Sequence, residues 1–326
     1  MMDWTDRHCR YFMRLLSPSV RLYTEMVTAA AIRYGDAGRL LHLDASEHPV
    51  ALQIGGNDPR LMAHVAKCDA AKAYDEININ VGCPSDRVRS GVFGACLMLQ
   101  PATVADCIKA MQDASSLAVT VKTRIGIEID GDARHRCYDS DGFLHDFVAA
   151  VAEAGCTTLI VHARIAVLGG LSPKDNRRVP PLDYERVYRL KEAFPGLGIC
   201  LNGGITTLAQ VRDHLRHVDA VMVGRQAYQA PWFLTELEAL CSRPGQSVLR
   251  DRVAVVEQML PYIEQELQHG CLLKHVTRHM LGLFAGQPGA RAWRRYLSEH
   301  AHRPGAGPEV LEQALRRQAQ AAASAS

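Results

Sequence analysis

Residues 78–85 read Asn-Ile-Asn-Val-Gly-Cys-Pro-Ser, and they close an alternating run that begins at residue 73. The alternation of side chains predicts a strand, and the Gly-Cys-Pro sequence ends it abruptly. The strand therefore delivers the thiol of Cys83 to the loop at its carboxyl end. In parallel α/β proteins this end of each strand carries the chemistry, because helices cover the faces of the sheet. Cys83 is therefore the first candidate for a functional residue.

Further strands alternate with helices along the first 240 residues. The predicted strands are 20–26, 49–54, 73–81, 117–124, 157–162, 198–202 and 219–223. The buried ones are continuous apolar runs, as is typical of parallel sheets. A helix is predicted at 7–16, capped by Thr5 or Asp6, and residues 126–142 are polar and irregular and are predicted as a functional loop. The pattern predicts an α/β protein with a (β/α)8 TIM barrel, whose first strand, expected just before Met1, is clipped.

A separate helical domain is predicted after the barrel, because the strand pattern stops near residue 243. Helical spacing follows at 252–268, 272–284 and 290–301, and the last of these segments is rich in Arg. From residue 314 the chain consists mainly of Ala, Gln and Ser, which have little to bury. We therefore expect a barrel domain at 1–242, a helical domain at 243–313 and a disordered tail at 314–326.

The composition excludes several classes of protein. The ten cysteines are scattered without C-x-x-C pairs, which disfavours a disulfide framework and a zinc site, and favours a reducing compartment. No apolar run approaches the roughly 18 residues of a membrane span, so we expect a soluble, cytoplasmic protein. Residues 241–326 contain 11 Lys or Arg against 7 Asp or Glu, whereas the whole chain has a net charge of only +2. Positive charge is thus concentrated in the C-terminal part, where a polyanion could dock.

Polar side chains recur at the predicted carboxyl ends of the strands. Any one of them alone is an ordinary loop residue, but six successive occurrences on one face of a barrel favour an active site. They are Gln53, Asn80 with Cys83, Lys122 with Arg124, His162 with Arg164, Asn202, and Arg225.

Glycines follow the last two predicted strands. Gly203 and Gly204 come after strand 198–202, and Gly224 follows strand 219–223. Barrels commonly form a phosphate site at this place from backbone N–H groups and a helix N-terminus. Arg225 could add a bidentate contact to the phosphate. We therefore expect a phosphate-anchored cofactor.

Such a cofactor would lie across the barrel mouth, with its reactive ring over the middle strands. Lys122 could then hold a positive charge beside an electron-rich ring, as a reduced flavin needs. Gln53 and Asn80 offer amides to ring carbonyl and N–H groups. His162 could contact the phosphate, the ring or the substrate, or it could be a satisfied histidine inside the barrel mouth.

The segment around Cys83 favours an acid over a nucleophile. A nucleophilic thiol needs a partnering base, and no His lies in this segment. An unperturbed cysteine thiol has a pKa of about 8.5 and is mostly protonated at neutral pH. Cys83 is therefore interpreted as a general acid, against the alternative of a buried structural thiol.

The motifs, in their order and spacing, resemble those of the tRNA-dihydrouridine synthases, and the terminal ones resemble the bacterial A-type subgroup. The barrel motifs are Asn-Val-Gly-Cys-Pro-Ser at 80–85, Gly-Ala at 94–95, Val-Thr-Val-Lys-Thr-Arg at 119–124, Val-His-Ala-Arg at 161–164, Asn-Gly-Gly at 202–204 and Gly-Arg at 224–225. The terminal motifs are Met-Met-Asp-Trp-Thr-Asp at 1–6, Tyr-Thr-Glu-Met at 23–26, Thr-Arg-His-Met-Leu-Gly-Leu-Phe at 277–284 and Pro-Gly-Ala-Arg at 288–291. The resemblance extends from Met1 to about His302.

The resemblance implies an FMN-dependent enzyme that uses NADPH to reduce D-loop uridines at positions 20 and 20a of tRNA, without a metal or a membrane, as a monomer. It implies that Cys83 donates the proton to C5 of the uracil ring. The residues implied to bind FMN are Gln53, Lys122, His162, Asn202, Gly203, Gly204, Gly224 and Arg225. Those implied to contact the tRNA D-loop and elbow are Asn80, Lys174, Arg177, Arg278, Arg291, Arg294 and Arg295.

Two alternatives stay open at this point. A small-molecule pyrimidine-reducing flavoenzyme of the dihydroorotate dehydrogenase type would share the barrel and the flavin, but it does not need a basic helical domain. A tRNA-binding protein whose catalysis is impaired by the missing first strand would need that domain and would take up no FMN.

Overall fold

The computed structural model describes residues 1–85, 93–129, 136–241 and 251–324. The chain divides into two compact units. The barrel unit comprises residues 23–43 and 50–224, and the helical unit comprises residues 1–22, 44–49 and 225–326.

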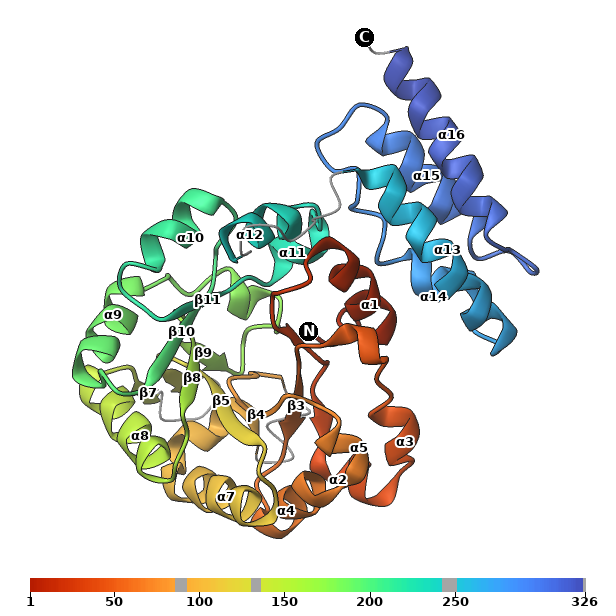
Figure 1. The fold of residues 1–326 in the computed structure, drawn as a ribbon. Helices are drawn as coiled ribbons and strands as arrows, with labels where there is room; N and C mark the ends of the chain where they lie inside the picture. The colour runs from red at the N-terminus through yellow and green to blue at the C-terminus, as the bar shows by residue number, and fades with distance from the viewer. Residues whose placement is uncertain (86–92, 130–135, 242–250, 325–326) are drawn as a thin grey trace. The chain divides into compact units, whose positions relative to one another are not determined.

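The barrel unit is built on a curved parallel sheet (Figure 1). Along its hydrogen-bonded path the strands are β1 (Leu22–Tyr23), β3 (Val50–Gly55), β4 (Glu76–Val81), β5 (Ala118–Arg124), β8 (Thr158–His162), β10 (Gly198–Asn202) and β11 (Ala220–Met222), and β2 (Val27–Thr28) also pairs with β3. All seven predicted strands are thus found. Within the described residues, β1 and β11 are the two ends of the path. The predicted α/β class is confirmed.

Helices cover the outer side of this sheet. Figure 1 shows α4, α7, α8, α9 and α10 following one another around it. The bounds of the helices are α2 (Ala29–Tyr34), α3 (Ala37–Leu40), α4 (Pro59–Lys67), α5 (Asp69–Lys72), η2 (Gly94–Leu99), α7 (Pro101–Ala114), α8 (Asp141–Glu153), η3 (Asp175–Arg177), α9 (Tyr184–Ala193) and α10 (Leu208–His214). Their apolar residues form the core against the strands, as Val104, Ile108 and Met111 of α7 do, each at most 1% exposed.

Local sequence signals set where these helices begin and end. The Asp58 side chain accepts from the backbone N–H of Arg60 and caps α4, and Pro59 occupies the first turn, where no N–H is needed. Gly155 follows α8 with a φ of +98°, the left-handed conformation that glycine adopts at little steric cost. The strand–helix alternation therefore follows directly from residues visible in the sequence.

A small second sheet replaces part of the predicted loop at 126–142. Its strands are β6 (Ile127–Ile129), β7 (Arg136–Tyr138) and β9 (Ala166–Leu168), in the order β7-β6-β9. β7 pairs antiparallel with β6, and β9 pairs parallel with it. The loop prediction is wrong for these residues, because their partners come from two separate segments and three-residue strands leave little periodicity.

The helical unit contains helices from both ends of the chain. They are α1 (Arg7–Leu16), η1 (Ala45–Glu47), α11 (Arg225–Gln229), α12 (Phe233–Cys241), α13 (Arg252–Gln268), α14 (Leu273–Thr277), α15 (Ala290–His300) and α16 (Glu309–Ala323). The predicted N-cap of α1 is confirmed for Asp6, whose side chain accepts from the backbone N–H of Cys9. No helix in the described parts of the chain has the length and hydropathy to cross a bilayer.

Charged side chains join α1 to the C-terminal helices. Arg7 forms a two-bond ion pair with Glu266 of α13. The carboxylate of Asp6 lies 2.5 Å from the guanidinium of Arg278 and 2.9 Å from Nε2 of His279. The division therefore differs from the expected domains, since α1 was assigned to the barrel domain; the expected boundary at 242 and 243 lies outside the described residues.

The C-terminal tail departs from its prediction. Residues 314–323 continue helix α16 instead of forming a disordered tail, and Ala314, Val310 and Leu311 are buried. The low hydropathy of residues 314–323 suggested disorder. Alanine nevertheless has a high helix propensity, and its small side chain can pack closely. A short apolar stripe at the start of the helix is enough to dock it.

Candidate active site

The face of β4 that carries Glu76, Asn78 and Asn80 is polar, and the alternate residues Ile77, Ile79 and Val81 are apolar. Because side chains alternate across a strand, the polar set shares one face and the apolar set the other. Glu76 is 1% exposed and Asn78 is fully buried. Hydrogen bonds must therefore satisfy these groups inside the protein.

The sheet register brings predicted site residues to the same level. Asn80 of β4 is the register partner of Lys122 of β5. His162 of β8 is the partner of Asn202 of β10. Gln53 of β3 is the register partner of Asn78, two residues before Asn80 on β4. Its side chain still contacts Asn80, whose Nδ2 donates to Gln53 Oε1 over 2.9 Å. The predicted cluster at the strand ends is thus built from neighbouring strands.

The backbone of Cys83 is held on both sides. Its N–H donates to Asn80 Oδ1 over 3.0 Å, and its C=O accepts from the N–H of Ala95 over 3.0 Å. The thiol is half-buried and lies 3.5 Å from Ser85 Oγ. A Cβ on Gly82 would lie 3.2 Å from the carbonyl carbon of Thr123, so the loop passes close to the backbone of β5. The geometry fixes a thiol at the carboxyl end of β4.

Lys122 provides a cation beside this loop. Burial, together with the positive charge of Arg124, lowers the pKa of Lys122 to about 8. The ammonium also interacts electrostatically with the thiols of Cys83 and Cys200. A lysine in this setting is still mostly charged at neutral pH and can stabilise negative charge that develops nearby.

Arg124 was predicted only as one of the polar residues at the strand ends, and the structure gives it a distinct task. Its guanidinium donates to the backbone carbonyls of Gly82 over 3.1 Å, of Ile165 over 3.3 Å and of Asn176 over 3.1 Å. It is 4% exposed, and burial lowers its pKa to about 10. Arg124 therefore ties together the loops after β4, β8 and β9. Its acceptors are backbone groups, so no sequence motif could have identified them.

His162 and the Gly203–Gly204 pair lie together. The two glycines have φ values of +121° and +72°. A Cβ built on Gly203 would lie 3.4 Å from His162 Nε2, so the imidazole packs against bare backbone. Tyr184 donates to the carbonyl of Gly203 over 2.8 Å. Successive backbone N–H groups in a turn can form a concave site for an anion.

The remaining predicted cofactor residues are placed as follows. Asn202 donates from Nδ2 to the carbonyl of Met222 over 2.8 Å and so joins β10 to β11. Gly224 follows β11, and Arg225 is the first residue of α11. The roles of Gly224 and Arg225 toward a phosphate stay predictions.

The predicted basic loop is anchored by Asn176, which the sequence did not single out, and by Arg164, which was predicted only as a polar residue at a strand end. Lys174 and Arg177 are exposed around η3. Between them, Asn176 is fully buried and exchanges hydrogen bonds of 2.8 and 2.9 Å with the backbone of Val167. Arg164, which is 9% exposed, donates to the carbonyl of Pro180. The loop therefore presents two exposed cations from a fixed backbone.

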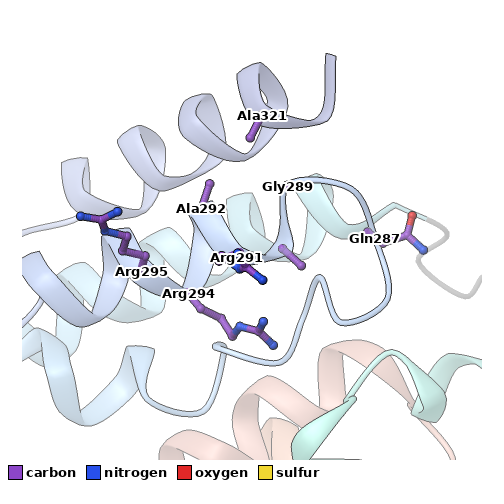
Figure 2. Close-up of a pocket in the computed structure, with 8 residues that line it drawn as sticks. Gln287, Gly289, Arg291, Ala292, Arg294, Arg295 and Ala321 are labelled. Atoms are coloured by element: carbon purple, nitrogen blue, oxygen red, sulfur yellow. The ribbon is translucent and has the colours of Figure 1, made fainter. Parts of the chain in front are cut away.

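Three predicted arginines of the helical unit line an open pocket of about 620 Å³. Arg291, Arg294 and Arg295 come from α15, and Ala321 of α16 also lines the pocket (Figure 2). Figure 2 shows Arg295 extending away from Arg291 and Arg294. Arg295 pairs with Glu299 over 2.8 Å, whereas no described residue forms an ion pair with Arg291 or Arg294. Arg278, which was also predicted to contact tRNA, forms an ion pair with Asp6.

The donor set of the barrel unit fits a flavin phosphate cofactor. The left-handed Gly203–Gly204 backbone suits a phosphate, and the cation of Lys122 suits the electron-rich edge of a reduced ring. The amide of Gln53 lies in the same region through its bond to Asn80. The arrangement can therefore combine anion binding, charge stabilisation and proton delivery from a thiol.

Comparison with known proteins identifies the family. The model of the dihydrouridine synthase family matches residues 1–320. A tRNA-dihydrouridine(20/20a) synthase of Yersinia pestis is 57% identical over 316 residues, which are 97% of this chain and 89% of that protein. Proteins with the same name are 57% identical over 317 residues in Salmonella typhimurium, at 97% and 92% coverage, and 56% identical over 317 residues in Escherichia coli K12, at 97% and 89%. The chain, a TIM-barrel protein with a helical appendage, therefore belongs to the dihydrouridine synthase family.

Proposed function

We propose that the protein is a tRNA-dihydrouridine synthase that reduces the C5–C6 bond of uridines 20 and 20a in the D-loop, with NADPH as the reductant. The observation that carries this proposal is the thiol of Cys83 at the end of β4, with its backbone held by Asn80, the register partner of Lys122. Membership of the family and the shared name of three close relatives support the substrate. The proposal includes a monomeric enzyme that acts in the cytoplasm.

The cofactor of the proposal is FMN. We assign its phosphate to Gly203, Gly204 and Arg225, with Gly224, Asn202 and His162 nearby, and its ring to Gln53 and Lys122. Bound FMN supplies the hydride that adds to C6 of the uracil. The ammonium of Lys122 then has a simple task, since it offsets negative charge at the ring edge in a place where burial strengthens the interaction.

The protein's own part of the reaction is the delivery of a proton. Addition to C6 leaves negative charge that is delocalised between C5 and O4, and C5 must take a proton from the opposite side of the ring. The S–H bond of Cys83 breaks as the C5–H bond forms, and the thiolate is later reprotonated from solvent. The fixed backbone of Cys83 favours this transfer, because the donor must lie within hydrogen-bond reach of the receiving atom.

The substrate is a macromolecule, and the exposed cations suit it. We assign Asn80 to the target base, Lys174 and Arg177 to the adjacent backbone, and Arg278, Arg291, Arg294 and Arg295 to phosphates of the D-loop and elbow. Arg291 and Arg294 are the strongest of these assignments, because they have no ion-pair partner among the described residues and line one pocket. Turning the target base out of its stack costs a few kcal/mol, which these contacts must offset.

Replacement of Cys83 tests the proposal. Cys83→Ala should retain FMN and oxidise NADPH at a rate close to that of the unaltered protein, because the thiol binds neither group. Dihydrouridine formation should fall by roughly two to four orders of magnitude, as expected for loss of a general acid. The measurement is mass spectrometry of tRNA from cells that lack other dihydrouridine synthases and express each variant.

Cys96→Ala is the matched control, since Cys96 is also half-buried and follows in the same segment. It should leave tRNA reduction unchanged. Full reduction of tRNA by Cys83→Ala would remove Cys83 from the mechanism, and loss of reduction with Cys96→Ala alone would transfer the role to Cys96.

A further inference from the structure

A line of side-chain hydrogen bonds runs through the interior of the barrel unit. It starts at Glu76 Oε1, which accepts from Thr120 Oγ1 over 2.8 Å. Thr120 Oγ1 accepts from Asn78 Nδ2 over 2.8 Å, and Asn78 Oδ1 accepts from Gln53 Nε2 over 2.9 Å. Gln53 Oε1 accepts from Asn80 Nδ2 over 2.9 Å. We call these five residues the polar relay.

The relay ends on the backbone of the loop that carries the thiol. Asn80 Oδ1 accepts from the N–H of Gly82 over 3.1 Å and from the N–H of Cys83 over 3.0 Å. The peptide that carries the Cys83 N–H is also held at its other side, because its C=O, that of Gly82, accepts from Arg124 Nε over 3.1 Å. The orientation of one amide side chain therefore decides whether two consecutive N–H groups of this loop are satisfied.

The chemistry at both ends gives the relay a single direction. A carboxylate only accepts, and the hydroxyls of Thr120 and Tyr23 converge on the same oxygen of Glu76, at 2.8 and 3.0 Å. The Thr120 hydroxyl therefore donates its only hydrogen to Glu76, and toward Asn78 it can only accept. At the other end, backbone N–H groups only donate, so Asn80 must present its oxygen to them.

The two ends agree on the orientation of every amide between them. Starting from Glu76, Asn78 must turn its nitrogen to Thr120 and its oxygen to Gln53, and Gln53 must then turn its oxygen to Asn80. The same orientations follow from the other end. Asn80 turns its oxygen to the Cys83 loop and its nitrogen to Gln53, and Gln53 then turns its nitrogen to Asn78. Asn78 is fully buried and Thr120 is 2% exposed, so water cannot replace a lost link there.

We propose that Glu76 is a positioning residue that acts through Thr120, Asn78 and Gln53 to orient Asn80 and, with it, the loop that places the Cys83 thiol. Glu76 lies at the start of β4 and Cys83 lies beyond its end, so the carboxylate acts without touching the substrate. The inference rests on the proposed function in one respect, namely that the Cys83 thiol donates a proton to the substrate. The relay itself is a property of the folded chain.

Substitutions at Thr120 test the relay, because they remove or keep one hydroxyl. Thr120→Val keeps the shape and removes the link between Glu76 and Asn78. It should lower kcat for dihydrouridine formation roughly 10- to 100-fold, as a misplaced reacting group does, with the KM for tRNA changed less than about threefold. Thr120→Ser restores the hydroxyl and should bring kcat back to within about threefold of the unaltered enzyme.

A second readout does not depend on turnover. The rate at which iodoacetamide alkylates Cys83, followed by mass spectrometry of its peptide, reports the position and exposure of the thiol. This rate should change in Thr120→Val by at least about threefold and stay unchanged in Thr120→Ser. Equal rates in both variants would overturn the proposal.

Thr123→Val is the matched control for a merely structural effect. Thr123 is on the same strand and fully buried, but its hydroxyl reaches only backbone carbonyls, at 3.4 Å, outside the relay. It should leave kcat and alkylation of Cys83 unchanged. If Thr123→Val and Thr120→Val lower kcat equally, the relay has no special role.

Two further comparisons keep the outcomes distinct. If Thr120→Val does not yield folded protein, Glu76→Leu replaces it, because leucine offers no acceptor to the Thr120 hydroxyl. A lower kcat and altered alkylation are then expected, and values equal to those of the unaltered protein in both readouts would overturn the proposal. If the unaltered enzyme forms no dihydrouridine, the proposed function fails, while the alkylation comparison still decides whether the relay positions the thiol.

Discussion

At the carboxyl end of β5, burial and the charge of Arg124 lower the pKa of Lys122 from 10.5 to about 8. Holding the charged form at neutral pH therefore destabilises the folded state. Because the unfolded state binds the proton more tightly, stability from this group rises as the pH increases from about 8 to 10.5 and is lowest below pH 8.

Lys122→Met should therefore separate stability from activity. We expect the FMN-free variant to gain about 1–3 kcal/mol in the free energy of unfolding at pH 7, with the gain shrinking above pH 8. Dihydrouridine formation should be lost. Urea denaturation at pH 7 and pH 10 measures the first effect, and the exposed Lys109→Met is the control. A variant less stable than the unaltered protein at pH 7 would show that the charge of Lys122 is compensated within the protein.

Individual candidate site residues could be predicted from the sequence where the chemical group of one side chain was enough to suggest a role. Cys83 and Lys122 stand out in the sequence as a thiol and a cation directly after or within apolar strands. The roles of Thr120 and Glu76 could not be predicted, because an interior threonine and a glutamate at the start of a strand are ordinary until their partners are known. Their importance depends on distances between strands.

Among the elements, the turn after β10 depends on a glycine at position 204. Gly204 has a φ of +72°, and a Cβ there would lie 2.6 Å from Leu182 Cδ1 and 2.9 Å from the hydroxyl of Tyr184. Gly204→Ala should cost about 1–3 kcal/mol in stability and weaken FMN retention, since the peptide would rotate away from the left-handed conformation.

Gly196→Ala is the control for that substitution, because no atom lies within 4 Å of the added Cβ. Fluorescence titration of FMN into each variant and urea denaturation give the two comparisons. Equal FMN affinity in Gly204→Ala and the unaltered protein would show that this turn does not bind the phosphate.

The main strands were predictable because each is a buried run with clear boundaries, and strand 198–202 matches β10 residue for residue. The strands β6, β7 and β9 were not, since each has three residues and is stabilised by a partner outside its own segment. Helix α16 was missed for a related reason, because composition suggested disorder while a few buried residues dock the helix.

At the scale of the whole chain, Asp6 joins the N-terminal helix of the helical unit to residues more than 270 positions later. Burial alone would raise the pKa of its carboxyl, but the hydrogen bond and charge of His279, with the Cys9 N–H and Arg278, hold the pKa well below its usual range. A carboxyl with a lowered pKa contributes stability above its unfolded pKa of 3.8, and this contribution is lost as the pH falls below that value.

Asp6→Asn should lower the free energy of unfolding by about 1–3 kcal/mol at pH 7, and the difference should shrink as the pH falls below 4. Asp3→Asn is the control, since Asp3 is exposed and its left-handed φ of +61° suits Asn equally well. Denaturation curves at several pH values measure the effect. A constant difference across this range would show that the loss does not come from the charge of Asp6, since Asn can keep the helix cap.

The grouping of α1 with the C-terminal helices could not be read from the sequence. The chain order suggested a barrel followed by a helical domain, whereas ion pairs such as that between Arg7 and Glu266 connect the two ends of the chain. Charged residues separated by 259 positions give no local signal of their pairing.

The clamp of Arg124 has a consequence for how such an enzyme can diversify. Its guanidinium recognises only backbone carbonyls, those of Gly82, Ile165 and Asn176. With Gly82 and Asn176 kept, side chains in the three clamped loops can therefore be exchanged without disturbing the clamp. An insertion or deletion of a single residue would instead displace a carbonyl and leave a buried charge without one of its acceptors. Substrate preference can thus drift through point substitutions in these loops while the position of the thiol is inherited unchanged.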